Sequence, residues 1–357
     1  MSLLKETIAK IQPLDKEVEK EANKYIDTLI KPIGALGRLE EIAAQIAGIT
    51  GKIKGNEMKK RGIIVMAADN GICDEGVASS PQSVTTIMTG CFIKGVTGMT
   101  VMAAEAKADV TVVDIGIKDE IDIPGVLNKK IANGTANFAK GPAMSYDDCV
   151  KAMEIGIETA NGLADSGYDI IGTGEMGIGN TSSSSCVLVS LTDVPMDIAA
   201  GKGAGLTDEA HAHKKKVLSD AIALNQPDPN DPIDVVAKVG GFDIAGMAGI
   251  FLACAANRIP VVVDGFISAA AALVAVRLCP AARDYMISSH CSAEPGFNAM
   301  IEAAGLKPML MLDMRLGEGS GCPIAFHVVD CALAMINNMA TFEEATINDD
   351  FLVDIRE

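Results

Sequence analysis

The sequence has little positive charge. Among its 357 residues, 30 Lys and Arg stand against 47 Asp and Glu, and the net charge is -17. Proteins that bind nucleic acid hold its phosphate backbone with clustered Lys and Arg. The composition therefore excludes nucleic acid as the main partner, and any phosphorylated ligand must be small and held locally.

Long uninterrupted apolar runs are also missing. Residues 1–12 mix charged and apolar side chains and lack the apolar core of a signal peptide. The longest apolar stretch, residues 259–278, contains Asp264 and Arg277, so it predicts a strand, a turn and a helix rather than a membrane span. We therefore expect a cytoplasmic protein that has no membrane partner.

Disulfide and metal motifs are absent as well. The nine cysteines include no Cys-x-x-Cys pair, which indicates reduced, mostly buried thiols rather than a disulfide framework. His211 and His213 are two residues apart, so on a helix they would lie on different faces and would not share a metal ion. We expect neither a metal nor another cofactor.

The chain does contain strands and helices in alternation, which predicts an α/β fold. The strand-like runs are apolar throughout, as is typical of parallel strands buried on both faces, and right-handed crossovers would place helices on both sides of the sheet. The predicted strands are residues 62–67, 110–115, 168–171, 260–263, 285–288 and 308–312. The helical segments between most of them are residues 84–106, 146–164, 208–224, 243–256 and 268–278.

Both ends of the chain have helical patterns. Residues 14–30 and 38–49 are the N-terminal candidates, and the tail from residue 331 onward also predicts helix. We expect residues 1–60 and 336–357 to pack together as a small helical domain beside a large α/β domain of residues 61–335.

Polar residues follow the predicted strands where each strand ends. In an open α/β sheet, ligands bind beyond the carboxyl ends of the strands. Each such residue alone is more often a helix cap or a satisfied loop residue, but six successive strand ends that carry them predict a composite active site. The residues concerned are Asp69, Asp114, Glu175, Asp264, His290, and the pair Arg315 and Glu318.

Glu318 is the strongest candidate for catalysis. It lies between Gly317 and Gly319, so no bulky neighbour shields its carboxylate from a ligand. Partial desolvation of such a carboxylate is how a general base acquires a useful pKa. His290 has two alternative roles at this point: it polarises a substrate, or it forms a structural hydrogen bond.

Two glycine-rich stretches could bind a phosphate. Residues 172–181 would present backbone amides near the start of a helix, although a tight strand-to-helix turn is the alternative. Their spacing is that of neither a Walker A loop nor a dinucleotide fingerprint. Residues 201–206 precede a helix with three successive lysines, 214–216, which would supply a cation or form a solvated face.

Five motifs, in order along the chain, resemble the nicotinate mononucleotide:5,6-dimethylbenzimidazole phosphoribosyltransferase family of cobamide biosynthesis. They are KPIGALGRLE at 31–40, GEMGIGNTS at 174–182, VVDGFI at 262–267, SSHCSAEPG at 288–296 and DMRLGEGSG at 313–321. The resemblance implies a Rossmann-like large domain on a six-stranded parallel sheet, a small helical domain from both chain ends, and a dimer whose partner helps to close each site.

The resemblance also implies roles for single residues. Glu318 matches the catalytic base, and Glu175 lies near the reacting groups. The nucleotide and its phosphate are assigned to Gly177, Gly179, Asn180, Lys214, Ser292, Arg315 and Gly317. The reaction moves the phosphoribosyl group of nicotinate mononucleotide to an aromatic base with inversion, and needs no metal because the pyridinium leaves as neutral nicotinate.

The motif around the incoming base departs from the family pattern. Asn70 replaces a histidine, Ala78 a serine, Ser80 a tyrosine and Ile87 a glutamine. With Ala78, Ser80 and Ile87 as walls of the base pocket, losing an aromatic ring and an amide removes a stacking surface and a hydrogen-bond partner. We therefore expect that phenol or p-cresol, as well as dimethylbenzimidazole, is a candidate acceptor.

The sequence also admits two alternatives to a self-sufficient enzyme. One is a catalytically silent paralogue that serves as the partner subunit of a heterodimer, and the retention of Glu175, Lys214, Arg315 and Glu318 favours activity instead. The other is a transferase that uses phosphoribosyl diphosphate, which is disfavoured because no strand ends in an acidic pair followed by a small-residue phosphate loop. A homodimer and a heterodimer both stay open.

Overall fold

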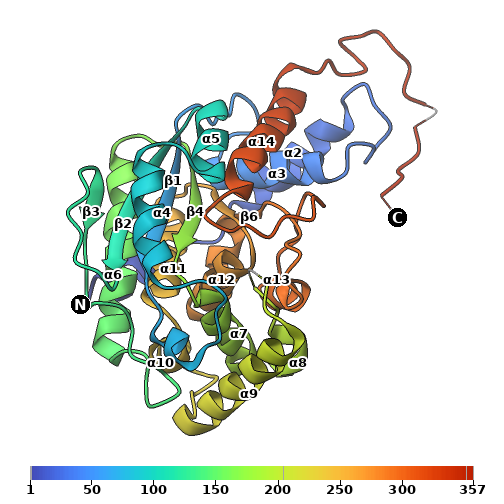
Figure 1. Ribbon diagram of the computed structural model, residues 1–357. Helices are drawn as coiled ribbons and strands as arrows, with labels where there is room; N and C mark the ends of the chain where they lie inside the picture. The colour runs from blue at the N-terminus through green and yellow to red at the C-terminus, as the bar shows by residue number, and fades with distance from the viewer. Residues whose placement is uncertain (1, 204, 351, 357) are drawn as a thin grey trace.

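The computed structural model describes residues 2–203, 205–350 and 352–356. Within these residues, six parallel strands form one sheet in the order β3-β2-β1-β4-β5-β6 (Figure 1). The order reverses between β1 and β4, which is where a doubly wound sheet opens a crevice for ligands. The strands are β1 (Arg61–Ala68), β2 (Ala108–Gly116), β3 (Val126–Asn128), β4 (Ile170–Met176), β5 (Val261–Val263) and β6 (Met286–Ser288).

Helices cover both faces of the sheet, as the apolar strands predict. Along β1, Ile64 and Met66 point into one hydrophobic cluster, whereas Ile63 and Val65 point into the other. The helices α6, α11 and α12 lie on the first face, and α4, α5 and α14 lie on the second. The prediction of a parallel α/β sheet with helices on both faces is confirmed.

The helices of the first half of the chain are α1 (Leu3–Lys10), α2 (Lys16–Asp27), α3 (Arg38–Thr50), α4 (Ser83–Ile93), α5 (Gly98–Glu105), α6 (Tyr146–Asp165) and α7 (Asn180–Leu191). Those of the second half are α8 (Met196–Ala199), α9 (Asp208–Asn225), α10 (Pro232–Val239), α11 (Phe242–Ala256), α12 (Phe266–Leu278), α13 (Phe297–Ala303) and α14 (Gly321–Asn338).

The strand predicted at residues 308–312 is wrong. Only Leu310 forms a bridge, to His290, and Met311 is 88% exposed. The apolar composition was misleading, because this segment runs along the edge of the sheet beyond β6. The sixth strand is instead β3, which has three residues and pairs with β2.

The single helix predicted over residues 84–106 is also wrong. The segment is divided into α4 and α5 by a turn in which Gly95 has a φ of 70°. Thr97 then starts α5 with a capping box. By length and composition alone, Ser83–Glu105 would be long and apolar enough to cross a membrane, and 33% of its most apolar window is buried inside the protein. This segment is weak evidence for a membrane span, because α4 and α5 are separate helices that pack on the sheet.

The two ends of the chain meet in part. Both α2 and α14 pack against α3, and Leu29 forms an antiparallel bridge with Thr341 (Figure 1). However, the tail is helical only as far as Asn338, so the predicted helix beyond it is wrong for the described residues. Moreover, α1 packs against α6 and α11 of the large part. The domain boundaries after residues 60 and 335 stay a prediction.

Candidate functional site

A cavity of about 180 Å³, partly open to solvent, lies beyond the carboxyl end of β4. Its wall is formed by four separate stretches of chain, which are residues 77–80, 175–181, 265–267 and 315–318, together with residues from α9 and from the loops that precede α9 and α13. Pockets at this position, beyond the carboxyl ends of the strands, are typical of small-molecule sites in α/β proteins.

Glu318 lies in the wall of this cavity, on the loop between residue 313 and α14. Its side chain is 8% exposed, and Oε2 is buried without a hydrogen-bond partner among the described residues. Burial, followed by the nearby charge of Glu175, raises the pKa of Glu318 to about 7. A carboxyl with this pKa changes protonation state near neutral pH, as a general base requires.

Glu175, at the end of β4, belongs to a buried carboxylate network. Its Oε1 accepts a hydrogen bond from the backbone N–H of Glu318 at 3.2 Å, and its Oε2 accepts one from Nδ2 of Asn180. The same Nδ2 donates to Oδ2 of Asp243 at 2.9 Å. Burial is the main cause that raises the pKa of Glu175, and it raises the pKa of Asp243 to about 7. One amide group therefore orders two carboxyls behind the cavity.

The anion-binding features lie on the side of the cavity formed by α7 and α9. Gly177, Gly179 and Asn180 lie in the wall where α7 begins, so the amino end of a twelve-residue helix borders the space. Lys214 of α9 is 1% exposed, and its Nζ donates to Oγ1 of Thr181 at 3.1 Å. Burial lowers the pKa of Lys214, whereas the nearby Glu294 raises it, and a bound anion would further favour the charged ammonium.

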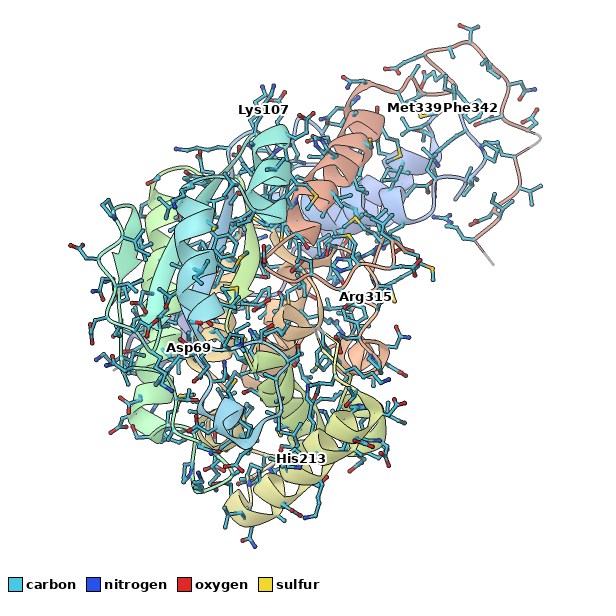
Figure 2. The ribbon with its side chains drawn as sticks, in the orientation of Figure 1. Asp69, Lys107, His213, Arg315, Met339 and Phe342 are labelled. Carbon is cyan, nitrogen blue, oxygen red and sulfur yellow. The ribbon has the colours of Figure 1, made fainter. Side chains whose placement is uncertain are left out.

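The remaining predicted nucleotide residues are also in the wall. Ser292 is buried, and its Oγ accepts the N–H of Glu294 at 3.4 Å. Arg315, labelled in Figure 2, is exposed beside the opening, and Gly317 follows it on the same loop. Glu294 shares this region, and burial raises its pKa although Lys214 and Arg315 act in the opposite direction.

The predicted base-pocket residues divide into two groups. Ala78 and Ser80 line the cavity, and both side chains are small. Ile87 does not line it, because Ile87 lies on α4 with Thr85 and Thr89 turned inward and is itself 60% exposed. The role of Ile87 as a wall of the base pocket therefore gains no support within this chain.

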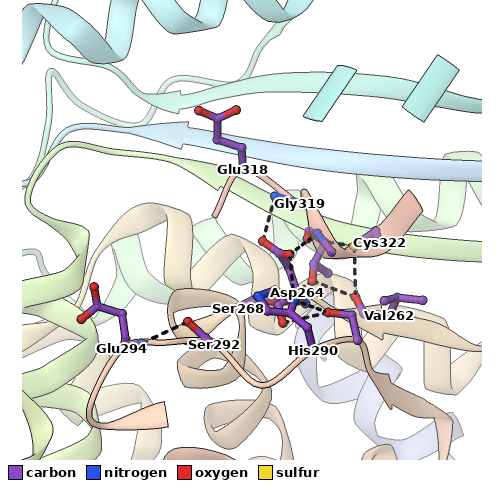
Figure 3. A network of polar contacts seen from close by, with 12 residues as sticks. Val262, Asp264, Ser268, His290, Ser292, Glu294, Glu318, Gly319 and Cys322 are labelled. Carbon is purple, nitrogen blue, oxygen red and sulfur yellow. Dashed lines mark hydrogen bonds and ion pairs between the residues drawn. The ribbon is translucent and has the colours of Figure 1, made fainter. Parts of the chain in front are cut away.

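Four of the strand-end residues do not reach the cavity. The Asp69 carboxylate accepts hydrogen bonds from the hydroxyl of Thr85 and from the N–H of Lys118. Asp114 accepts hydrogen bonds from two backbone amides that follow it in the chain. His290 is hydrogen-bonded to Ser289 through Nδ1 at 3.0 Å, which favours the structural alternative for this histidine. Asp264 contacts the Glu318 loop from behind (Figure 3).

The three successive lysines of α9 lie in different environments. Lys214 points into the site, whereas Lys215 pairs with Asp197 and Lys216 with Asp220 at the surface. His213 of α9 (Figure 2) contacts the carbonyl oxygen of Glu75 through Nε2 at 2.8 Å. The solvated-face alternative therefore describes Lys215 and Lys216, and the phosphate-binding role stays a prediction for Lys214.

Sequence reasoning missed Asp243, which is buried and completes the network behind the cavity. In the sequence it follows two glycines at the start of a helix, where an acid is ordinarily a partner of the helix dipole. No local signal separates the two roles. In the part of the chain that the structure describes, no group of three or more His, Cys, Asp or Glu side chains could hold a metal ion, and all nine cysteines are free.

Comparison with known proteins agrees with this geometry. A family model described as phosphoribosyltransferase matches residues 11–347. Nicotinate-nucleotide--dimethylbenzimidazole phosphoribosyltransferase of Clostridium tetani is 52% identical over 358 residues, covering 100% of this chain and 99% of the relative. The protein of the same name from Geobacter sulfurreducens is 47% identical over 348 residues, covering 97% and 99%.

Solved structures give the same result. The crystal structure of nicotinate-nucleotide-dimethylbenzimidazole phosphoribosyltransferase from Thermus thermophilus superimposes with a TM-score of 0.89 at 36% sequence identity. The match covers 94% of this chain and 100% of that chain.

Proposed function

The chain belongs to the phosphoribosyltransferase family, and on that premise we propose that it transfers the phosphoribosyl group of nicotinate mononucleotide to an aromatic base. The products are nicotinate and an α-riboside 5′-phosphate, the lower-ligand nucleotide for cobamide assembly. The single observation that carries the proposal is the position of Glu318: a buried carboxylate with a raised pKa lies in the same cavity as Lys214 and the amide loop of α7.

The nucleotide phosphate is held by Lys214 and the amino end of α7. A desolvated ammonium and a helix N-terminus both favour a phosphate over water. The phosphate then lies at the α9 side of the cavity, and the ribose extends toward Glu175 and Glu318. Arg315 and Ser292 border the same space. The loop of residues 77–80 is left for the incoming base.

The reaction breaks the bond between the ribose anomeric carbon and the nicotinate nitrogen, and the electron pair passes to that nitrogen. The incoming base forms its bond to the same carbon from the opposite face, which inverts the β-nucleotide to an α-riboside. Glu318 accepts the proton that the attacking base loses. The carboxylates of Glu175 and Glu318 also favour the positive charge that develops on the sugar.

The acceptor is dimethylbenzimidazole or a single-ring phenol such as p-cresol. Support for both comes from the small side chains of Ala78 and Ser80, which leave the acceptor end of the cavity uncrowded. A phenol has a reference pKa of about 10, so its deprotonation depends more strongly on a desolvated Glu318.

The enzyme acts as a dimer, either of two copies or with a paralogue, and each partner helps to close the other's cavity. Support comes from large apolar side chains that are exposed on α4, on α5 and in the turn between them. Leu316 of the cavity wall contacts the start of α5 and is exposed as well, so this apolar surface reaches the cavity. A silent partner role is disfavoured because Glu175, Lys214, Arg315 and Glu318 all surround one cavity.

The test is an assay of the purified protein with nicotinate mononucleotide and a panel of dimethylbenzimidazole, benzimidazole, phenol and p-cresol. We expect base-dependent release of nicotinate, an α-configured product by NMR, and full activity after exhaustive chelation. No release with any base, or transfer only from phosphoribosyl diphosphate with Mg²⁺, would refute the proposal.

A further inference from the structure

We propose that Asp264 is a positioning residue for Glu318: its two carboxylate oxygens fix the backbone of the loop that carries the general base. The geometry of this inference comes from contacts within the chain. Its kinetic consequence rests on the proposed transferase function.

The loop has an unusual backbone. Gly317, Glu318 and Gly319 follow one another with φ values of 79°, 63° and 88°, all in the left-handed region. Glycine adopts this region freely, but a residue with a side chain does so rarely. A left-handed glutamate persists only where surrounding contacts determine it, and such residues cluster at functional sites.

Asp264 supplies two of those contacts. It follows β5 and is 1% exposed. Its Oδ2 accepts the N–H of Gly319 at 3.0 Å, and its Oδ1 accepts the N–H of Gly321 at 2.6 Å (Figure 3). Gly321 is the first residue of α14, so the carboxylate also lies at the amino end of an 18-residue helix. The loop is thereby joined to the end of β5 immediately after Glu318.

Asp264 acts through the backbone only. In Figure 3 the Glu318 side chain points away from Asp264, and Asp264 does not line the cavity. From the other side, the N–H of Glu318 donates to Glu175 at 3.2 Å. Asp264 and Glu175 therefore hold the amides on each side of the Glu318 side chain, which leaves that side chain directed into the cavity.

Asp264 is itself held in place. Its N–H donates to Oγ of Ser268 at 3.1 Å, and Oγ of Ser289 donates to its carbonyl oxygen at 3.1 Å. The titratable groups that face it are His290, whose Nδ1 is 4.0 Å from Oδ1, together with Glu175 and the thiol of Cys322. The Ser268 and Ser289 hydroxyls therefore hold the backbone of Asp264 beside the loop.

The experiment compares Asp264→Asn with a matched control, Asp114→Asn. Asparagine has one acceptor oxygen in place of two, so at least one loop amide loses its partner. Asp114 lies near the end of β2, is fully buried and accepts two backbone amides, from Gly116 and Ile117, through Oδ1, but it does not line the cavity. The control therefore reports the effect of replacing a buried carboxylate outside the site, and urea unfolding of both variants measures any loss of stability separately.

Three properties are measured on the full chain: kcat and KM for nicotinate mononucleotide, the pH profile of kcat/KM, and hydrogen–deuterium exchange of residues 315–321. For Asp264→Asn we expect kcat to fall about 10- to 100-fold with KM changed less, as for a displaced catalytic group. Exchange in the loop should rise, and the acidic limb of the profile should move to lower pH because the freed Glu318 gains water. The control should show none of these changes.

The proposal is overturned if Asp264→Asn matches the control in kcat and in loop exchange. If the wild type converts no nicotinate mononucleotide but loop exchange rises only in Asp264→Asn, the proposed function fails and the positioning role stands. Should Asp264→Asn not fold, Ser289→Ala removes the donor to the Asp264 carbonyl. Ser289→Ala should then lower kcat by a few-fold, raise exchange in the loop and move the acidic limb to lower pH. Wild-type values of kcat and loop exchange in Ser289→Ala would overturn the proposal.

Discussion

At the scale of single residues, Glu318 is in an unfavourable state in the folded chain. Oε2 of its carboxyl is buried without a hydrogen-bond partner among the described residues, and its backbone is left-handed. Each condition disfavours folding, and neither contributes to packing. Strain and desolvation at one side chain are expected where chemistry requires them, which agrees with its proposed role as the base.

Ser80 is the residue at which acceptor choice is most directly tested. Because Ser80 lines the cavity, Ser80→Tyr restores the aromatic ring of the family pattern and its stacking surface for a two-ring base. We expect the ratio of kcat/KM for dimethylbenzimidazole to kcat/KM for p-cresol to rise by about 10-fold, or about 1.4 kcal/mol, as for a regained pocket contact. Competition assays with both bases present measure this ratio.

The matched control is Ser80→Ala, which removes the hydroxyl without adding bulk and should leave the ratio within about twofold of wild type. An unchanged ratio in Ser80→Tyr would mean that residues 77–80 do not contact the acceptor. Ile87→Gln in the same assay tests the sequence-based prediction that restoring the amide favours benzimidazole.

At the scale of elements, the contact between α6 and α11 depends on glycine. A Cβ at Gly156 of α6 would overlap the carbonyl oxygen of Gly246 in α11, and a Cβ at Gly249 would overlap that of Met153. The two helices therefore touch backbone to backbone behind the sheet. This close packing fixes α11, which carries Asp243 at its first turn.

Gly156→Ala should destabilise the protein by about 3 kcal/mol, because backbone cannot yield as a side chain does. Gly162→Ala, on the same helix, is the matched control: no atom lies within 4 Å of its added Cβ, so helix propensity should stabilise the protein by about 0.5 to 1 kcal/mol. Urea unfolding measures both changes. Equal effects at the two positions would contradict the close contact.

Most strands and helices, but not all, could be predicted from the sequence pattern. Five of the six strands and most long helices could be predicted, because buried parallel strands are apolar throughout and helices between them have a regular period. The strand at 308–312 could not be excluded, since composition does not reveal whether an apolar run finds a partner in the sheet. The break between α4 and α5 depends on the left-handed Gly95, and a lone glycine is a weak signal.

At the scale of the whole molecule, the proposed dimer would bury the apolar surface of α4 and α5. Val101 on α5 is 57% exposed, and Val101→Glu would place an unpaired charge in the interface. We expect this variant to be a monomer near 37.1 kDa by light scattering, and wild type to have about twice that mass. Leu224→Glu, equally exposed at 57% on α9, should stay a dimer.

A dimeric Val101→Glu would place the interface elsewhere, and a monomeric wild type would favour a paralogue as the partner.

The folded chain brings together residues that lie far apart in sequence. Glu175, Lys214 and Glu318 could be predicted from their loops and motifs. Asp243 and the support from Asp264 could not, because both depend on which loops the fold places behind the cavity.

In the proposed reaction one carboxylate, that of Glu318, acts as the general base. The general base works in its deprotonated form, and burial raises the pKa of Glu318 to about 7. Activity should therefore be lost as pH falls through about 7 and be complete above it, whereas a glutamate with its ordinary pKa would be fully active well below that pH. Asp243 and Asp264 also have pKa values near 7, so a variant must separate them from Glu318.

The most direct measurement is the profile of kcat/KM between pH 5.5 and 8.5, which spans about 1.5 units on each side of that pKa, for wild type and Glu318→Gln. We expect an acidic limb near pH 7 in wild type. In Glu318→Gln, activity should be roughly 100-fold lower and the limb absent, while nicotinate mononucleotide still binds by calorimetry. Near-wild-type turnover in Glu318→Gln, or the same limb in both proteins, would contradict the claim.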